Sequence, residues 1–406
     1  MKVLGIIAEY NPFHNGHLYQ LNKAKEIISP DYTVCILSSN FVQRGEPSII
    51  NKWARAKSAI LAGIDLVIEL PTIYSTSSSE YFGFSSIKIL DSLNIVDFLC
   101  FGSEDGKLEN IQNLSDILSN EDDNFKSLLK KELESGISFP KARGIALQKL
   151  NPQISEESII GSNNILAIEY LKALNKLKSP IKPVTIKRIS NSYNSQNLSG
   201  AISSATSIRL NISSTKIKDT MPSFSYEILQ EEIDNGRAPI FIKDYESLIL
   251  GLLRLQTPEQ LQNLPYVAEG LHNRLYKATQ NSCSLEEFLE QSQTKRYTKT
   301  RINRIITNLL SSITKHDLEY ITALGGPPYA RVLGFNKNGE KLLKKATKQS
   351  TIPIITNLKQ AKNSCNPLIK RVSQIEEAST NIYVLGYKNT SLKKAGADFK
   401  TKFLKL

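Results

Sequence analysis

Short apolar runs alternate with helical patterns along the first half of the chain. Four compact runs are long enough for strands and too short for helices: residues 3–8, 32–37, 64–70 and 96–101. Helical patterns fill the intervals, at residues 16–28, 52–62 and 76–93. Because the runs are apolar throughout, the predicted strands are buried on both faces, as in a parallel sheet covered by helices. The pattern therefore predicts an α/β fold with a Rossmann-like parallel sheet, which binds ligands at the carboxyl ends of its strands.

The rest of the chain has a mainly helical pattern. One more strand is predicted at residues 183–187, and helical periodicity resumes after residue 222 and dominates through residue 320. A Gly-Gly-Pro-Pro sequence at 325–328 interrupts it, and residues 381–385 predict a last strand. At 406 residues the chain exceeds the usual size of a single core. We therefore expect two domains, residues 1–215 with the sheet and a mainly helical part at residues 216–406.

Charge is distributed unevenly between these two parts. Lys and Arg number 22 against 21 Asp and Glu in residues 1–210, and 29 against 18 in residues 211–406. A near-neutral first half and a basic second half indicate different partners, with a polyanion such as nucleic acid expected for the second. The alternative is a merely Lys-rich composition without a nucleic-acid partner.

The sequence predicts neither a membrane span nor paired cysteines. No run approaches the eighteen or so apolar residues of a membrane span. The four cysteines are scattered and form no Cys-x-x-Cys pair, so neither disulfides nor a zinc site is expected. These features predict a cytoplasmic protein.

Two histidines stand at the first predicted strand-to-helix junction. The strand ends at Ala8-Glu9, Gly16 opens the helix, and His14 and His17 flank that glycine. A helix N-terminus offers unpaired N–H donors to an anion, and imidazole N–H groups beside it can bond phosphate oxygens as charge develops. A metal pair and a purely structural role are the alternatives. No third ligand lies near in sequence, so we expect no metal here.

A second polar segment, residues 202–209, combines four hydroxyl side chains with Arg209. Hydroxyl residues at this density are typical of a helix N-cap. Together with the guanidinium of Arg209 they predict a clamp for polyphosphate. Alone such a segment is more often structural, and the histidine pair strengthens its interpretation.

The motifs resemble a known family. Residues His14-Asn15-Gly16-His17 look like the HxGH signature of the nucleotidyltransferase superfamily, and residues 202–209 are similar to its second signature, of ISSTxIR type. The chain more closely resembles the tRNA(Met) cytidine acetate ligase family, in segments of both halves: residues 9–18, 43–47, 52–56, 101–104, 295–302 and 328–336. The resemblance therefore covers essentially the whole chain.

The resemblance implies a two-step reaction. Acetate would attack the α-phosphate of ATP, with Mg²⁺ expected, to give acetyl-adenylate and pyrophosphate. The N4 amine of the wobble cytidine of elongator tRNA(Met) would then take the acetyl group, giving N4-acetylcytidine. Residues 1–215 would be the ATP-binding catalytic domain and residues 216–406 the tRNA-binding domain.

The same resemblance assigns site residues. The catalytic residues would be His14, His17 and Arg209. The ATP site would comprise Ile7, Ala8, Glu9, Tyr10, Asn11, Pro12, Phe13, His14, Asn15, Gly16, His17, Leu18, Tyr19, Gln20, Gly102, Asn163, Asn164, Arg188 and Ile189. In one departure from the family pattern, Ser162 stands before the two asparagines in place of the expected proline.

Basic residues outside the ATP site predict contacts with tRNA. Lys295, Arg296, Lys299, Arg301 and Arg304, with Tyr297 among them, would form a basic helical face suited to phosphates. The alternative is a solvated helix face. A group of four polar residues follows the second predicted strand and is expected to contact either the acyl carboxylate or the tRNA: Gln43, Arg44, Lys52 and Arg55.

Two other functions remain open at this point. One is a small-molecule adenylyltransferase that makes a nucleotide cofactor, although the GxFDxxH sequence usual in such enzymes is replaced by Glu9-Tyr10-Asn11-Pro12-Phe13. It would also leave the basic second half without a role. The other is a non-catalytic RNA-binding protein, which the intact histidines and Arg209 speak against.

Overall fold

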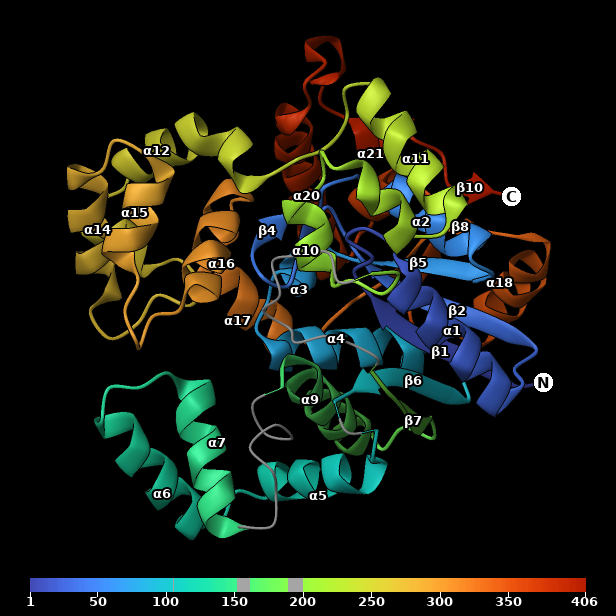
Figure 1. The fold of residues 1–406 in the computed structure, drawn as a ribbon, viewed down its shortest axis with the longest axis horizontal. Helices are drawn as coiled ribbons and strands as arrows, with labels where there is room; N and C mark the ends of the chain where they lie inside the picture. The colour runs from blue at the N-terminus through green and yellow to red at the C-terminus, as the bar shows by residue number, and fades with distance from the viewer. Residues whose placement is uncertain (105, 152–160, 189–199) are drawn as a thin grey trace.

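The computed structural model describes residues 1–104, 106–151, 161–188 and 200–406 (Figure 1). Its strands are β1 (Val3–Ala8), β2 (Tyr32–Ser38), β3 (Phe41–Val42), β4 (Glu46–Pro47), β5 (Leu66–Leu70), β6 (Phe98–Ser103), β7 (Lys182–Lys187), β8 (Ala330–Phe335), β9 (Ile354–Ile355) and β10 (Leu404–Lys405).

Helices account for most of the remaining described chain. The α-helices of the first half are α1 (Asn15–Ile28), α2 (Lys52–Leu61), α3 (Thr72–Ser75), α4 (Ser79–Ser92), α5 (Leu108–Ser119), α6 (Asp123–Glu134), α7 (Phe139–Leu150), α9 (Ser162–Leu177) and α10 (Ala205–Leu210). Those of the second half are α11 (Ser223–Asp234), α12 (Glu246–Arg254), α13 (Pro258–Gln262), α14 (Leu271–Asn281), α15 (Leu285–Ser292), α16 (Lys299–Leu310), α17 (Lys315–Ala323), α18 (Lys337–Gln349), α19 (Leu358–Lys362), α20 (Pro367–Tyr383) and α21 (Ala397–Lys400). Short 3₁₀ helices occupy Thr215–Thr220, Ile242–Tyr245, Val384–Gly386 and Thr390–Leu392.

The central sheet has the strand order β10-β8-β5-β2-β1-β6-β7, with β9 paired to β8. Strands β5, β2, β1, β6 and β7 run parallel to one another, which confirms the parallel sheet predicted for the first half. Strand β8 joins this sheet antiparallel to β5, with a bulge between Val67 and Ile68. The chain runs outward from β1 through β2 to β5 and returns to β6 on the other side of β1. The order thus reverses between β1 and β6, the kind of point where such sheets bind ligands.

Both faces of the sheet are covered by apolar side chains, because successive strand residues point to opposite sides. Leu4 and Ile6 pack with α1 and α2, whereas Val3 packs with α4 and α9 on the other face. The same alternation holds along β2 and β5. This two-sided burial explains why the strands read as continuous apolar runs.

The second half contributes to two separate cores. Helices α12 to α16 form their own apolar cluster, to which Tyr383 and Phe41 also belong (Figure 1). Beyond residue 330 the chain returns to the central sheet as β8, β9 and β10, so the sheet takes strands from both sides of residue 215. The division at residue 215 therefore stays a prediction about function.

The strand predicted at residues 381–385 is wrong. Helix α20 runs to Tyr383, and Val384–Gly386 form a 3₁₀ turn. The apolar run exists because Tyr383 and Val384 are buried in the helical cluster. None of the described helices has the length and hydropathy that a bilayer span requires.

Candidate active site

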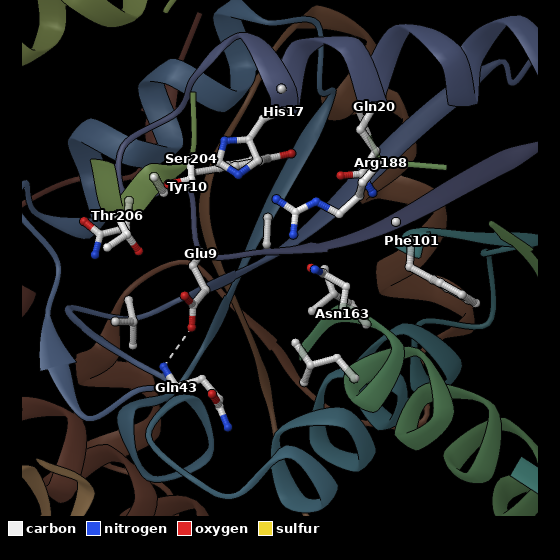
Figure 2. A pocket seen from close by; sticks show the side chains of 18 of the residues that line it. Glu9, Tyr10, His17, Gln20, Gln43, Phe101, Asn163, Arg188, Ser204 and Thr206 are labelled. Carbon is white, nitrogen blue, oxygen red and sulfur yellow. Dashed lines mark hydrogen bonds between the residues drawn. The ribbon is translucent and has the colours of Figure 1, made fainter. Parts of the chain in front are cut away.

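A cleft of about 490 Å³ opens at the carboxyl ends of β1, β6 and β7. It lies at the reversal point of the sheet, between β1 and β6. Its lining draws on the β1–α1 turn, β6, the start of α9, the end of β7 and the start of α10. Figure 2 shows that side chains from these segments converge on one space. The position agrees with the one that the sequence pattern predicts.

The two histidines form the N-terminus of α1. His14 is the N-cap residue, and its Nδ1 accepts a hydrogen bond from the backbone N–H of Gly16 at 3.1 Å. His17 Nδ1 in turn accepts from the backbone N–H of His14 at 3.2 Å. The rings stack with centroids 3.7 Å apart. Because each Nδ1 is an acceptor, each neutral ring carries its proton on Nε2, which is left as a donor.

Burial keeps these histidines neutral. It lowers the pKa of His14 to about 3, with smaller contributions from Arg188 and Arg209. Burial also lowers the pKa of His17, helped by His14 and Arg188. Both rings are therefore uncharged donors at neutral pH, a form suited to phosphate oxygens whose charge grows during displacement.

Gly16 is required by the approach of the His14 ring. A Cβ atom at this position would lie 2.9 Å from His14 Cε1 and 3.0 Å from its Nδ1. Real Cβ contacts are longer, so any other residue would push the imidazole out of place. The glycine of the HxGH sequence thus fixes the orientation of the first histidine.

Glu9 places a half-buried carboxylate in the cleft. Its Oε1 accepts the backbone N–H of Gln43 at 2.7 Å, and Figure 2 shows the side chain directed toward Gln43. Burial raises the pKa of Glu9, and the N–H of Gln43 and the charges of Arg44, Arg209 and Arg55 offset part of this rise.

The opposite side of the cleft combines Gly102, Asn163 and Arg188. A Cβ atom on Gly102 would lie 3.2 Å from Arg188 Cγ, so the glycine leaves room for the arginine. Glu104 accepts the backbone N–H of Asn163 at 3.2 Å and that of Asn164 at 2.9 Å, which caps the start of α9. The arrangement holds Asn163 in the lining.

Arg209 bridges the two polar segments that the sequence singles out. Its guanidinium donates from one terminal nitrogen to the carbonyl of Asn11 at 2.9 Å and from the other to Thr206 Oγ1 at 3.3 Å. Ser204 caps α10 by accepting the backbone N–H of Ser207 at 3.1 Å. The N-cap prediction for residues 202–209 is confirmed, and the segment packs beside the β1–α1 turn.

Several residues assigned to the ATP site do not line the cleft in the described structure: Pro12, Phe13, Asn15, Leu18 and Asn164. Phe13 is fully buried, with its ring edge-on to Tyr10 at 4.7 Å. Asn15 Nδ2 donates to the carbonyls of Ala201 and Asp219, which ties α1 to the α10 region. Asn164 Oδ1 accepts the backbone N–H of Glu104 at 3.0 Å. Phe13, Asn15 and Asn164 thus hold the segments that line the cleft without lining it themselves. Ile189 lies outside the described residues.

The four polar residues after β2 divide into two pairs. Gln43 and Arg44 line the cleft, whereas Lys52 and Arg55 are fully buried away from solvent. Arg55 donates to the backbone carbonyls of Glu9 at 2.7 Å and Ser39 at 2.5 Å. Arg55 is thus a support for the end of β1 and not a ligand contact.

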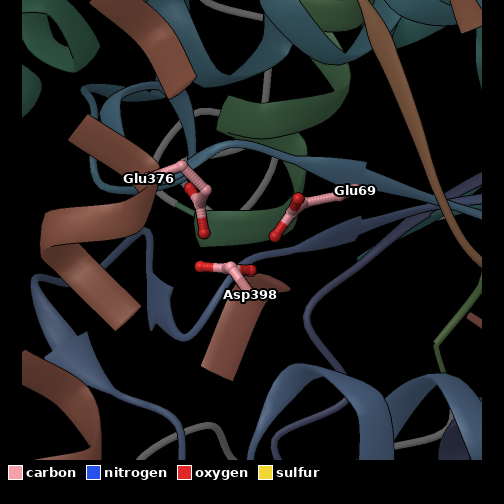
Figure 3. A group of neighbouring side chains, drawn as sticks. All are labelled: Glu69, Glu376 and Asp398. Carbon is pink, nitrogen blue, oxygen red and sulfur yellow. The ribbon is translucent and has the colours of Figure 1, made fainter. Parts of the chain in front are cut away.

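Lys52 lies in a buried charge cluster formed by three carboxylates and Arg331. Figure 3 shows Glu69, Glu376 and Asp398 converging from different elements. Such a group is a candidate cation site, but Lys52 Nζ lies 2.6 Å from Glu69, 2.8 Å from Glu376 and 2.8 Å from Asp398. The lysine ammonium therefore takes the position that a metal ion would need.

The predicted basic face at residues 295–304 is not one helical face. Helix α16 begins at Lys299, so Lys295 and Arg296 precede it, and Tyr297 is buried with its hydroxyl donating to the carbonyl of Glu269 at 3.0 Å. Lys295, Arg296 and Lys299 are exposed. The hydrogen bond and the burial of Tyr297 hold this segment in place before the helix begins, so the charged residues do not share one helical face.

Arg301 and Arg304 turn inward from this segment. Arg301 Nε donates to the carbonyl of Tyr266 at 2.9 Å, and its guanidinium lies over the Tyr297 ring. Arg304 lines the cleft together with Thr300, one turn earlier on α16. The cleft therefore includes residues of the second half. The sequence assigns Arg304 to tRNA but does not place it or Thr300 in the cleft, because only the docking of α16 reveals that position.

This fold and this cleft define a class of protein, the nucleotidyl transferases with paired histidines at the first strand–helix turn. The model of the HIGH Nucleotidyl Transferase family matches residues 1–398, and the chain belongs to that family.

Comparison with individual relatives assigns the chain to a more specific family. The chain is 48% identical, over 98% of each chain, to the tRNA(Met) cytidine acetate ligase of Acetivibrio thermocellus. It is 44% identical, over the full length of both chains, to the protein of that name from Thermoanaerobacter sp. strain X514. The crystal structure of Thermotoga maritima TmcAL superposes with a TM-score of 0.94 at 34% identity over both whole chains. Its form bound with alpha-thio ATP has a TM-score of 0.92. The chain thus belongs to the tRNA(Met) cytidine acetate ligase family.

Proposed function

We propose that this protein is an ATP-dependent ligase that acetylates the wobble cytidine of elongator tRNA(Met). One observation carries the proposal. A single cleft holds His14, His17, Arg188 and Arg209, in a chain that aligns over 98% of its length with a tRNA(Met) cytidine acetate ligase. The relatives support this function and not the cofactor-forming adenylyltransferase that the sequence alone left open.

In the first step a carboxylate oxygen of acetate attacks the α-phosphorus of ATP. A phosphorus–oxygen bond to acetate forms, the bond to the β-phosphate oxygen breaks, and pyrophosphate leaves. His14 and His17 are proposed to donate from Nε2–H to phosphate oxygens, and Arg209 to hold the outer phosphates. Gly102, Asn163 and Arg188 would surround the adenosine side.

ATP is proposed to enter as its Mg²⁺ complex. Mg²⁺ usually binds through substrate phosphates, water and one or two carboxylates. Glu46 is a carboxylate in the described lining of the cleft, and it would hold such a loosely bound ion. The ion would neutralise charge on the phosphates, whereas the histidines and arginines position them.

In the second step the N4 amine of cytidine attacks the acetyl carbonyl carbon of acetyl-adenylate. The new carbon–nitrogen bond gives N4-acetylcytidine, and AMP leaves. Residues 216–406 are proposed to bind the tRNA, since eleven of the twelve excess positive charges lie beyond residue 210. A cytoplasmic location stays a prediction from the sequence.

Acetate-dependent ATP–pyrophosphate exchange tests the first step. The wild-type protein is expected to exchange only when acetate is present. His17→Ala and Arg209→Ala each remove a proposed phosphate contact, and a loss of about 10²–10³-fold in rate is expected. His316→Ala is the matched control, because His316 is exposed on α17. Exchange that proceeds equally without acetate would overturn the proposal.

A further inference from the structure

The cleft contains more surface than the nucleotide site assigned by motif. A second group of lining residues comes from the β3–β4 hairpin, the start of α4 and helix α16: Val42, Gln43, Arg44, Glu46, Ser79, Thr300 and Arg304. None of these belongs to the segments assigned to ATP. They form one side of the cleft, which meets the nucleotide side at Glu9 through the hydrogen bond to Gln43.

The hairpin and α16 are docked to one another. Thr307 Oγ1 donates to the carbonyl of Gly45 at 2.8 Å, and Asn303 Nδ2 donates to Glu46 Oε1 at 3.3 Å. Gly45 has a φ of +73°, and a Cβ atom there would lie 2.3 Å from the backbone nitrogen of Arg304. Glycine is therefore required at the hairpin tip both for its conformation and for the close approach of α16. The contact fixes Gln43, Arg44 and Arg304 around one opening.

Arg304 supplies a buried donor that has no acceptor among the described residues. Its Nε–H is buried and, within the described part of the chain, has no hydrogen-bond partner. One terminal nitrogen reaches the carbonyl of Ser77 only at 3.4 Å, and the guanidinium lies over the Tyr266 ring at 5.4 Å. A buried N–H without an acceptor is destabilising, so a ligand oxygen is expected to complete this site. A nucleotide phosphate or a base carbonyl has the required chemistry.

The exposed basic residues lie next to the same opening. Lys299 immediately precedes Thr300, and Lys295 lies four residues before Lys299. Lys299 lies on the same helix as Thr300 and Arg304, which line the cleft, so RNA bound by this lysine would be close to the opening. This placement favours an RNA nucleotide as the occupant.

Glu9 lies where the two groups of lining residues meet. The hydrogen bond from Gln43 uses Oε1, and no other described residue donates to the carboxylate, so Oε2 is available to a substrate. The charged groups that face it are Arg44 of the hairpin, Arg55 of α2 and Arg209 of α10. Burial raises the pKa of Tyr170 on α9, and the nearby charge of Glu9 raises that pKa further.

We propose that the opening between the β3–β4 hairpin and α16 is the subsite for the acceptor cytidine, and that Glu9 is the general base of the second step. This rests on the proposed function. The exocyclic amine of cytosine is a poor nucleophile, because its lone pair is delocalised into the ring. As that lone pair forms the bond to the acetyl carbon, one N4 proton passes to Glu9 and AMP leaves with the electrons of the broken carbon–oxygen bond. Glu9 then returns the proton to solvent.

Two assays separate the two steps. Acetate-dependent ATP–pyrophosphate exchange reports the first, and transfer from chemically supplied acetyl-adenylate to tRNA(Met) reports the second. E9Q keeps the oxygen that accepts from Gln43 but cannot take a proton. It is expected to lower the transfer rate by about 100-fold or more, and exchange by a much smaller factor. In the wild type the transfer rate should rise with pH until Glu9 is ionised, and this rise should be absent from E9Q.

Two further variants keep the test decisive. E9D retains a carboxylate and should recover part of the transfer rate and its pH dependence. R304M keeps the aliphatic stem and should raise KM for tRNA by about tenfold more than KM for ATP, as expected for loss of one charged hydrogen bond. Glu109→Gln, on an exposed position of α5, is the matched control for E9Q.

The outcomes distinguish this inference from the proposed function. Transfer by E9Q at the wild-type rate, or an equal loss of exchange and transfer, would overturn the role of Glu9 as the base. An equal rise of both KM values in R304M would overturn the acceptor subsite. Absence of acetate-dependent exchange in the wild type would instead overturn the proposed function.

Discussion

Each of the two histidines proposed to be catalytic is held by a backbone hydrogen bond at its Nδ1 atom. Nδ1 of His14 and Nδ1 of His17 both accept from amides of the β1–α1 turn, so the helix N-terminus fixes their tautomers. The same amides would otherwise be unpaired donors of the first helical turn. The two backbone N–H groups are thus used by the imidazole rings, and the Nε2–H group of each ring is left as a donor in the cleft.

The neutral state of the histidines predicts the pH dependence of the first step. Burial lowers the pKa of His14 to about 3 and that of His17 well below its ordinary value, so neither ring gains a proton until the pH is strongly acidic. The kcat/KM for ATP in pyrophosphate exchange should show no inflection from these rings between about pH 5 and 8, where free histidine titrates. An inflection in that range that disappears in His14→Asn would contradict the assignment.

Gly16→Ala tests the orientation of His14. The added Cβ would lie 2.9 Å from the imidazole, so KM for ATP should rise about tenfold, equivalent to about 1.4 kcal/mol of binding free energy. Helix stability should change little, because alanine is a good helix former. Gly251→Ala on α12 is the matched control, since no atom lies within 4 Å of its added Cβ. An unchanged KM for ATP in Gly16→Ala would show that the ring is free to move.

Among the elements, α16 joins the two halves of the molecule at the cleft. Its residues Asn303 and Thr307 bind the β3–β4 hairpin, and Thr300 and Arg304 line the cleft. Its N-terminal end carries exposed Lys299, preceded by exposed Lys295. One helix thus connects the proposed tRNA-binding surface with the site of chemistry.

Removing the two exposed lysines together should weaken tRNA binding and reduce its salt dependence. Each lost phosphate contact should lower the slope of log K against log salt by about 0.7–0.9. The double variant Lys295→Gln, Lys299→Gln is compared with Lys341→Gln, Lys348→Gln on α18. The second pair removes the same charge from a helix at the opposite edge of the view in Figure 1. Equal slopes for the two double variants would place the tRNA elsewhere.

Strands with strong local patterns could be predicted from the sequence, and those that depend on distant partners could not. Residues 3–8 are β1 as predicted, because the apolar side chains of this run pack on one face of the sheet or the other. The sequence presents the residues of β8 only as a family motif, because the pairing of β8 with β5 brings together residues more than 260 positions apart. The run at 381–385 failed for the opposite reason, because a short apolar run also suits the end of a buried helix.

The candidate site divides in the same way. The spacing of His14 and His17 and the hydroxyl-rich start of α10 are local signals that predict phosphate binding. The separation of Gln43 and Arg44 from Lys52 and Arg55 is not local, because it depends on which side chains the C-terminal helices cover. The inward direction of Arg304 likewise follows from the docking of α16 on the hairpin.

At the scale of the whole molecule, a buried charge cluster links the N-terminal sheet to the C-terminal helices. Lys52 of α2 and Glu69 of β5 meet Arg331 of β8, Glu376 of α20 and Asp398 of α21. Glu376 also accepts the hydroxyl of Ser39 and the backbone N–H of Thr72. The cluster therefore positions the end of β2. The β3–β4 hairpin comes directly after this end, and Arg55, which holds the backbone of Glu9, also binds there at Ser39.

Loss of Lys52 should destabilise the fold strongly. Lys52→Met leaves three buried carboxylates with Arg331 as their only described cation, and removing one partner of a buried ion pair costs about 3–5 kcal/mol. Lys57→Met is the control, because Lys57 pairs with Glu231 at the surface and should contribute under about 1 kcal/mol. Denaturant unfolding gives both free energies. Similar values for the two variants would show that the cluster carries no special stability.

In the proposed function, one cleft activates acetate with ATP and passes the acetyl group to cytidine in tRNA(Met). Mass analysis of nucleosides tests it most directly, after tRNA(Met) is incubated with the protein, ATP, Mg²⁺ and isotope-labelled acetate. Labelled N4-acetylcytidine is expected with the wild type, and a loss of about 10²-fold or more with His17→Ala. Unlabelled cytidine alone in the wild-type reaction, with ATP and acetate present and the protein folded, would contradict it.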